Sequence, residues 1–470
     1  MLLLYFLKLS LTQSIDLTSG SIEGYFSLSE ISSVLSNYCK THPNLELISI
    51  GKTLNNREIS GLRLPNPQRP RMLVIGGHHA RELISMSQVF YILDHILTSL
   101  KLNKEIWFIP VLNVDGLAGI SEEYSKTRKI LEIRKNLHPS SCPKEEMGID
   151  LNRNYGYQWG YDNTGSSSNP CDEEYRGEFA FSEKETQAIK NLTEKYKFDS
   201  VISYHSYGNM YIRPTGFKES PMSELPLAHQ EVYKELKSIL PQSFRFGSVN
   251  DLLHYKVNGS FMDYLYSLGI FSIEIEISPE SLNTFHPNIV QLPSILKPHL
   301  EPFDLIFNRT SSYLHIDVKN FGRKLMIKVE NTGLATEYSK EIVLNVVDKK
   351  FKYKVLSAHL NKVVDGMVYV TLGNIPSGGE DLVEVMVYCD VHEVNVSVHF
   401  WPAGEREQNF YGELKLKVKQ SSYIAKVVVF VVIFVVLLIF VLAGCVCYRL
   451  RDFDKVEFME MVDIMPSGSI

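Results

Sequence analysis

The chain has 470 residues, of which 44% are hydrophobic, enough for a sizeable core and for more than one ordinary domain. Its 48 Lys and Arg against 54 Asp and Glu give a net charge of −6 at pH 7. This balance excludes a broadly basic protein and gives no general signal for nucleic-acid binding.

The N-terminal segment is the first element of the chain. Residues 1–14 begin with an apolar run from Leu2 to Leu7, which is typical of a secretory signal peptide. The segment lacks a basic start and a clear cleavage site, so a buried N-terminal strand is the alternative. We interpret residues 1–14 as a signal peptide.

Apolar runs alternate with helical patterns between residues 20 and 312. This alternation is typical of an α/β domain in which helices cover both faces of a sheet. The predicted helices are 83–100, 182–197 and 226–240, and the predicted strands are 45–50, 72–75, 106–109, 200–204 and 271–277.

A histidine and a glutamate follow the strand 72–75 directly, in the stretch GGHHARE of residues 76–82. Two glycines allow a sharp turn there, so that His79 and Glu82 can face one point. His205 follows the strand 200–204 in the same manner. Ligands gather beyond the carboxyl ends of such strands, and a catalytic zinc takes three protein donors. The pattern indicates a metal site, although His-x-x-Glu alone is weak evidence and a lone His is commonly a core residue.

Cysteines and glycosylation motifs agree with a secreted location. Cys142 and Cys171 lie in one loop-rich stretch, and we expect them to form a disulfide in an oxidising compartment. Asn-x-Ser/Thr motifs fit a face outside the cytosol, where they carry glycans or stay unused. These motifs begin at Asn191, Asn258, Asn308 and Asn395.

The pattern changes after residue 312. Between 313 and 420 the apolar runs are short and alternating or β-branched, with turns rich in Gly and Pro between them, which predicts a small β-sandwich domain. The predicted strands are 315–318, 325–329, 342–346, 367–371, 383–388 and 394–400.

A transmembrane helix is predicted at 427–448. Residues 427–447 carry no charge, and about 20 apolar residues in a helix cross the ~30 Å hydrocarbon core. Basic residues flank both ends, so charge gives no orientation. The signal peptide instead predicts a single-pass type I membrane protein, with residues 449–470 as a cytoplasmic tail and the other domains extracellular or in a secretory or endolysosomal lumen.

Further motifs follow one another between residues 20 and 312. They are GGHHARE (76–82), LNVDG (112–116), IRKN (133–136), GIDLNRNYGY (148–157), YRG (175–177), AFSE (180–183), YHSY (204–207), YKVNG (255–259) and the strand 271–277. These stretches occur in the order in which zinc carboxypeptidases of the carboxypeptidase A and carboxypeptidase T type carry them, so the chain resembles this family. The resemblance implies an α/β fold with a mixed central sheet and one zinc ion in the catalytic domain 20–312. By position alone, the β-sandwich is similar to the transthyretin-like domain of some members.

The resemblance assigns His79, Glu82 and His205 as the zinc ligands. It implies that Asp150 accepts a hydrogen bond from the His79 ring and so fixes the tautomer of that ligand. It also implies that Arg134 stabilises the oxyanion of the transition state.

The resemblance makes Glu276 the general base. Glu274 lies two residues earlier on the same strand, so both carboxylates point to one face. The spacing of the family favours the second of them, and we assign the base to Glu276.

Four residues are implied to bind the substrate. Asn152 and Arg153 grip its terminal carboxylate, since a guanidinium pairs bidentately with a carboxylate. Tyr255 closes over the terminal residue, and Arg81 supports the adjacent subsite. A structural ion pair is the alternative for Arg81 and for Arg134.

The pocket for the terminal side chain gives conflicting signals. Family spacing places Gly216 and Met262 in it, and two uncharged residues favour an apolar or aromatic terminal residue. Glu274 enters the same pocket, and a carboxylate there favours Lys or Arg. The preference therefore stays open at this stage.

We predict a membrane-anchored zinc metallocarboxypeptidase that hydrolyses the C-terminal peptide bond of peptides or proteins. The predicted partners are peptide C-termini and the membrane, with no nucleic acid. Two alternatives stay open: an inactive cell-surface binding or adhesion protein, and a zinc amidase acting on an isopeptide or a modified C-terminus.

Overall fold

The computed structural model describes residues 15–66, 70–99 and 104–311 and, between 314 and 419, the strands with a few adjoining residues. The predicted signal peptide (1–14), transmembrane helix (427–448) and tail (449–470) lie outside the described residues. Among the helices that are described, none is both long and apolar enough to cross a membrane. The chain divides into two compact units, Met1–Leu225 with His229–Thr310, and Pro226–Ala228 with Ser311–Ile470.

The first unit is built on an eight-stranded sheet with the strand order β1-β2-β4-β3-β5-β8-β6-β7. Strands β4, β3, β5 and β8 pair in parallel at its centre, whereas β1, β2 and β6 pair antiparallel to neighbouring strands. The sheet is therefore mixed, as predicted. Its strands are β1 (Glu46–Lys52), β2 (Glu58–Leu64), β3 (Arg71–Ile75), β4 (Glu105–Ile109), β5 (Ser200–Ser206), β6 (Met210–Arg213), β7 (Arg245–Ser248) and β8 (Phe271–Ile277).

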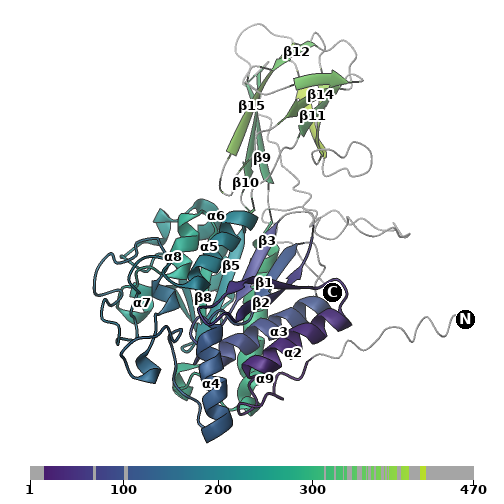
Figure 1. Cartoon of the computed structure of the whole chain (residues 1–470). Coiled ribbons are helices and arrows are strands. Elements are labelled where there is room, and N and C mark those ends of the chain that lie inside the picture. The colour runs from purple at the N-terminus through teal and green to yellow at the C-terminus, as the bar shows by residue number, and fades with distance from the viewer. Residues whose placement is uncertain are drawn as a thin grey trace, which may run out of the picture. The chain divides into compact units, whose positions relative to one another are not determined.

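Helices lie on both sides of this sheet, with α2, α3 and α9 on one side and α5, α6 and α8 on the other (Figure 1). Helix α3 is buried on all sides over most of its length, where its polar residues Ser85, Ser87 and Gln88 are buried together with the apolar ones. The helices are α2 (Leu28–Thr41), α3 (Leu83–Ser99), α4 (Val114–Thr127), α5 (Lys184–Tyr196), α6 (Leu227–Ile239), α7 (Val249–Leu253), α8 (Phe261–Ser267), α9 (Leu292–Leu296) and α10 (Leu300–Arg309).

The second unit contains antiparallel strands that form two sheets, with the orders β12-β15-β10-β9 and β13-β14-β11-β16-β17. All six strands predicted beyond residue 312 are present. The face-to-face packing of the sheets as a sandwich, and its likeness to a transthyretin-like domain, stay predictions. The strands are β9 (Leu314–Phe321), β10 (Lys324–Asn331), β11 (Glu341–Val346), β12 (Lys352–Val355), β13 (Asn361–Val364), β14 (Met367–Thr371), β15 (Glu380–Tyr388), β16 (Glu393–Trp401) and β17 (Glu413–Lys419).

The sequence did not predict strands β2, β6 and β7 of the first unit. β6 and β7 have four residues each, too few for a periodic pattern. β2 contains Gly61, where a Cβ would lie 2.2 Å from the carbonyl oxygen of Phe108. A glycine within a strand marks such a close backbone approach but weakens the strand signal.

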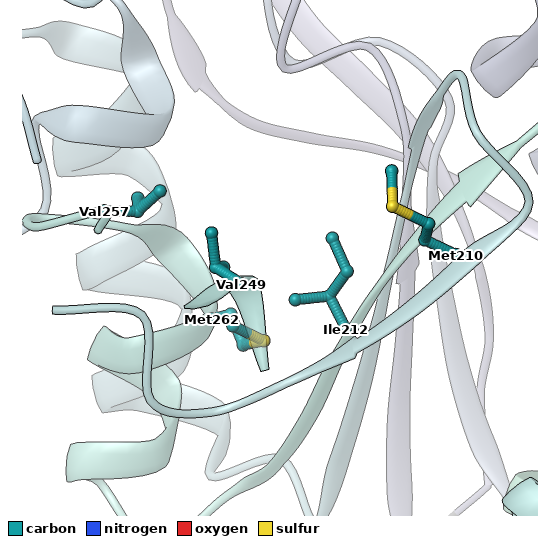
Figure 2. Close-up of a cluster of buried hydrophobic side chains, with 5 residues drawn as sticks. All are labelled: Met210, Ile212, Val249, Val257 and Met262. Carbon is teal, nitrogen blue, oxygen red and sulfur yellow. The ribbon is translucent and has the colours of Figure 1, made fainter. Parts of the chain in front are cut away.

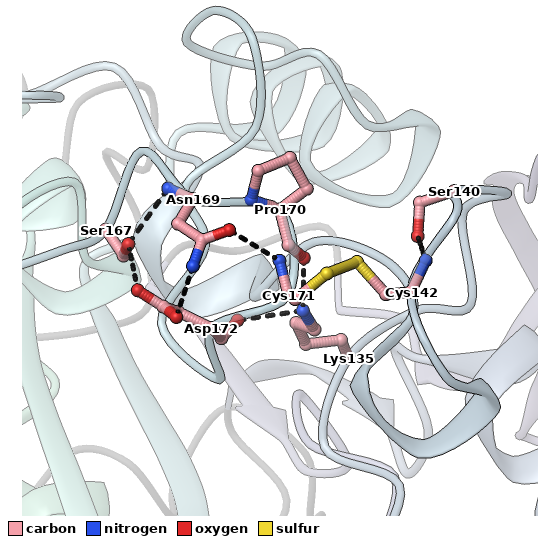
Figure 3. The surroundings of a disulfide bond; sticks show 8 residues. All are labelled: Lys135, Ser140, Cys142, Ser167, Asn169, Pro170, Cys171 and Asp172. Atoms are coloured by element: carbon pink, nitrogen blue, oxygen red, sulfur yellow. Dashed lines mark hydrogen bonds between the residues drawn. A yellow bond between two sulfur atoms is a disulfide. The ribbon is translucent and has the colours of Figure 1, made fainter.

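Cys142 and Cys171 form the predicted disulfide (Figure 3). The buried ammonium of Lys135 donates hydrogen bonds of 2.8 Å to the carbonyl oxygens of Pro170 and Asp172, on either side of Cys171. The disulfide and Lys135 together hold the loop around residue 171 against the segment 133–136.

Removing this disulfide by Cys142→Ala with Cys171→Ala is expected to lower the free energy of unfolding. The two cysteines are 29 residues apart, and closing a loop of that length contributes about 3–4 kcal/mol by restricting the unfolded chain. Chemical denaturation measures the loss. Cys39→Ala is the control because Cys39 is a free cysteine; an equal loss in the control and the double variant would contradict the expectation.

Candidate metal centre

The predicted ligands lie at the carboxyl ends of two parallel strands. His79 and Glu82 stand between β3 and α3, and His205 lies at the end of β5, which pairs with β3. Gly77 has φ +61°, and a Cβ there would lie 3.1 Å from the Cα atom of Val111, so the turn requires a glycine.

The three predicted ligands converge on one point. Nδ1 of His79 lies 2.6 Å from Oε1 of Glu82, Nδ1 of His205 lies 3.1 Å from Oε2, and the two Nδ1 atoms are 3.3 Å apart. All three side chains are buried. Among the described residues, this is the one group of His, Cys, Asp or Glu whose ligand atoms lie close enough to share a metal ion. Two imidazole nitrogens with a carboxylate oxygen fit zinc.

Electrostatics at this point favours a positive charge. Burial alone would raise the pKa of Glu82. The charge of His79 and the hydrogen bond from His205 outweigh burial and hold this pKa well below its usual range. Burial also opposes a charged His205, yet the hydrogen bond to Glu82 raises the pKa of His205 to about 9. The attraction of Glu82 for positive charge favours a divalent cation at this position.

Asp150 joins His79 to Arg134. Its Oδ1 lies 3.2 Å from Nε2 of His79, and its Oδ2 accepts hydrogen bonds from Nε and Nη2 of Arg134 at 3.1 and 2.8 Å. Burial alone would raise the pKa of Asp150, but the charge of Arg134 outweighs burial and holds this pKa well below its usual range. A charged Asp150 keeps the proton of His79 on Nε2, which leaves Nδ1 free to bind a metal.

A second hydrogen-bond chain, which the sequence did not predict, lies behind His205. Oγ of Ser203 lies 3.0 Å from Nε2 of His205 and 3.4 Å from Nδ1 of His78, and Nε2 of His78 lies 3.1 Å from the hydroxyl of Tyr155. Burial lowers the pKa of His78 well below its usual value, so its ring is neutral. The hydroxyl of Ser203 can therefore accept a hydrogen bond from Nε2–H of His205 while it donates one to Nδ1 of His78. This arrangement leaves Nδ1 of His205 to face Glu82.

Glu276 lies beside the three ligands. Strand pairing places it opposite His205, with Glu274 opposite Ser203. Oε2 of Glu276 is buried without a hydrogen-bond partner, a costly state that a bound water would relieve. Burial and the charge of Glu82 raise the pKa of Glu276 to about 8; a nearby cation would lower it again. The position suits the predicted general base.

Arg153 and Asn152 follow Asp150 in the short turn Leu151–Arg153. Arg153 is buried, and its Nε has no hydrogen-bond partner. Oδ1 of Asn152 accepts the backbone N–H of Phe261 at 2.8 Å, which orients the amide. An incompletely paired, buried guanidinium is suited to bind a carboxylate.

Arg81 forms an ion pair, which was the structural alternative to its predicted role in substrate binding. Its guanidinium donates two hydrogen bonds, of 2.7 and 3.1 Å, to the carboxylate of Glu173, and it lies 4.3 Å from the ring centroid of Phe285. Glu173 belongs to the loop that the disulfide holds. The predicted subsite role of Arg81 stays a prediction.

The remaining predicted residues lie on three elements. Tyr255, on the segment between α7 and α8, is 48% exposed, Met262 is buried on α8, and Gly216 follows β6. Asn258 is also buried, and its Nδ2 donates a 2.8 Å hydrogen bond to Oδ1 of Asp162. Because a glycan would attach at this nitrogen, the motif at Asn258 is sterically closed in the folded unit.

Residues 31–301 match the model of the family described as zinc carboxypeptidase, which is more than half of the chain. The chain belongs to the zinc carboxypeptidase family. It is 32% identical over 259 residues to zinc carboxypeptidase A 1 of Anopheles gambiae, covering 52% of this chain and 57% of that protein. It is 30% identical over 278 residues to carboxypeptidase A1 of Rattus norvegicus, covering 56% and 64%. The match thus spans about three fifths of these relatives' length.

Solved structures support the fold of the first unit. Bovine thrombin-activatable fibrinolysis inhibitor, in complex with tick carboxypeptidase inhibitor, matches with a TM-score of 0.52 at 25% identity, covering 62% of this chain and 99% of that chain. Carboxypeptidase A from Helicoverpa armigera matches with a TM-score of 0.51 at 24% identity, covering 64% and 77%. The predicted carboxypeptidase-like α/β fold is confirmed. Carboxypeptidase A is a standard example of a His2Glu zinc site, so this ligand set is a known property of the family.

Ser203→Ala is expected to weaken zinc binding by roughly 10- to 100-fold, because the hydrogen-bond partner that orients a ligand is lost. Competition with a chelating indicator measures the affinity. Ser206→Ala is the matched control, since its Oγ bonds the carbonyl oxygen of Phe285 and not a ligand ring. Equal affinities in Ser203→Ala and in the unaltered protein would show that Ser203 does not position His205.

Proposed function

We propose that this protein is a zinc metallocarboxypeptidase that releases single residues from the C-termini of peptides or proteins. The convergence of His79, Glu82 and His205, with the unpartnered Oε2 of Glu276 beside them, is the observation that carries the proposal. Membership of the zinc carboxypeptidase family supports it.

The site residues divide the reaction between them. The three ligands hold zinc, which when bound is a Lewis acid that lowers the pKa of a coordinated water towards ~7. Glu276 accepts the proton of the attacking water at Oε2 and then donates it to the leaving amine. Arg134, fixed by Asp150, presents Nη1 on the ligand side, 3.3 Å from Nδ1 of His79, and stabilises negative charge on the substrate carbonyl oxygen.

Specificity for a free C-terminus comes from Arg153 and Asn152. The guanidinium of Arg153 pairs with the terminal carboxylate of the substrate, which favours an exopeptidase over an enzyme that acts on blocked ends. Tyr255, exposed on the neighbouring segment, closes over the bound terminal residue.

The proposal extends to a membrane anchor. The uncharged run 427–447 and the apolar segment 1–14 support a type I protein with the catalytic unit outside the cytosol. The disulfide between Cys142 and Cys171 supports an oxidising compartment. We expect protease added to the cytosolic side of sealed membranes to remove only residues 449–470 and to leave the catalytic unit intact until the membranes are opened. Digestion of the catalytic unit in sealed membranes would contradict this orientation.

Glu276→Gln is expected to lower kcat by roughly 100- to 10,000-fold, because the amide cannot accept a proton from water. Zinc content should stay unchanged, since Glu276 is not a ligand. Release of the terminal amino acid from unblocked peptides measures kcat, and a chelator should abolish the activity of the unaltered protein until zinc is restored.

Peptides with an amidated C-terminus are the control for that assay. They should be poor substrates, because Arg153 loses its carboxylate partner. Faster cleavage of amidated or isopeptide-linked substrates would favour the amidase alternative, and binding of peptides without any release would favour the binding protein. If Glu274→Gln removes all turnover while Glu276→Gln does not, the base is Glu274.

A further inference from the structure

A carboxylate without a cation lies in the same unit as the metal centre. Glu274 is 6% exposed, and its hydrogen-bond partner among the described residues is Nδ2 of Asn152, at 3.0 Å. No Lys, Arg or His of the described part of the chain forms an ion pair with it. An ionised carboxylate is costly in such surroundings, so a ligand that brings a positive charge to Glu274 is favoured.

Glu274 shares a sheet face with the catalytic groups. Along β8, Glu276 is opposite His205 on β5, and Glu274 is opposite Ile212 on β6. Residues two apart point to the same face, and a strand rises ~3.4 Å per residue, so Glu274 lies ~7 Å further from the carboxyl end than Glu276. This depth is close to the reach of the four-carbon stem and ammonium of lysine.

Apolar side chains lie beside Glu274. Ile212, its cross-strand neighbour, belongs to a buried cluster that forms between β6 and the segment from α7 to α8. Gly216 borders the cluster, since a Cβ there would lie 3.3 Å from Cβ of Val257 and 3.5 Å from Cγ2 of Val249. In Figure 2, Val249 and Met262 face Ile212 across the interior. The cluster consists of Met210, Ile212, Val249, Val257 and Met262.

Apolar neighbours beside a buried carboxylate suit a ligand side chain with an aliphatic stem and a cationic end. Asn152 links Glu274 to Arg153, the residue next to it in the chain, which is placed to bind the terminal carboxylate. Arg153 thus provides a binding point for a negative group, and Glu274, which Asn152 contacts, provides a separate one for a positive group. A C-terminal lysine or arginine carries both groups on one residue.

We infer that the catalytic unit releases lysine and arginine in preference to apolar residues, with Glu274 binding the side-chain cation. The inference rests on the proposed carboxypeptidase function. The uncharged Gly216 and Met262 agree with it, because they contact the methylene groups and not the charge. Burial and the charge of Glu274 also raise the pKa of the nearby Asp263 to about 7, and a cation beside Glu274 would relieve that repulsion.

The competing role for Glu274 is purely structural, as the acceptor that orients Asn152. Glu274→Gln separates the two roles, because the Gln carbonyl can still accept the Asn152 hydrogen bond but carries no charge. Glu280→Gln is the matched control, since Glu280 is exposed and pairs with Arg245 at the surface.

The test is kcat/KM of the full chain on four peptides that differ only in a C-terminal Lys, Arg, Leu or Phe. The unaltered protein should favour Lys and Arg by at least about tenfold. Glu274→Gln should lower kcat/KM for Lys and Arg by roughly 30- to 1,000-fold, the effect of removing one partner of a buried charge pair, and leave Leu and Phe within about threefold. Glu280→Gln should resemble the unaltered protein on all four.

Three results overturn the inference. A higher kcat/KM of the unaltered protein for peptides ending in Leu or Phe overturns the inference directly, even if Glu274→Gln does not fold. An equal loss on all four peptides makes Glu274 a positioning residue for Asn152. Equal affinity of the Glu276→Gln variant for Lys- and Leu-terminated peptides, measured by calorimetry, shows that no cation site exists. Failure to cleave any of the four peptides instead overturns the proposed function itself.

Discussion

The buried carboxylate of Glu82 is the group on which the metal centre depends. Its two oxygens face two imidazole rings that come from distant parts of the chain, and Oε2 also accepts the backbone N–H of Ser206 at 3.2 Å. In a site of low polarity this negative charge interacts strongly with any nearby cation. The same charge draws the nitrogens of His79 and His205 to one point, although both rings could otherwise turn to other partners.

Backbone contacts hold the surroundings of Glu82 in place. The N–H of Arg81 donates to the carbonyl oxygen of Ile133 at 2.7 Å, and Nδ2 of Asn113 donates to the carbonyl oxygens of Arg134, at 3.1 Å, and of His78, at 3.3 Å. These bonds tie the ligand loop to the segment that carries Arg134, and Lys135 continues the connection to the disulfide loop. The active groups are therefore positioned by segments that are themselves fixed, which a catalytic site requires.

The sequence predicted the parts of the site that depend on local patterns. His79 and His205 were found because each follows an apolar strand, and strand alternation placed Glu274 and Glu276 on one face. Ser203 could have been found by the same alternation from His205. The contact of His78 with Tyr155 could not, since it joins residues whose proximity depends on the packing of the whole unit.

Other features were hidden because they lie in irregular segments. The pairing of Arg81 with Glu173 depends on the path of the disulfide loop, which has no periodic pattern. Asn258 resembles a surface glycosylation motif in sequence, and only the fold shows that its amide is buried. The short strand β6 was missed for lack of length, although it carries Ile212 beside Glu274.

The most direct test of the account is X-ray absorption at the zinc edge of the purified, metal-loaded protein, with its zinc content. We expect one zinc per chain, bound by two imidazole nitrogens at about 2.0–2.1 Å and by oxygen, without sulfur. Loss of one imidazole from this set in His205→Ala would agree with the assignment. A spectrum with sulfur ligands, or one that His205→Ala leaves unchanged, would contradict the claim that His79, Glu82 and His205 share one ion.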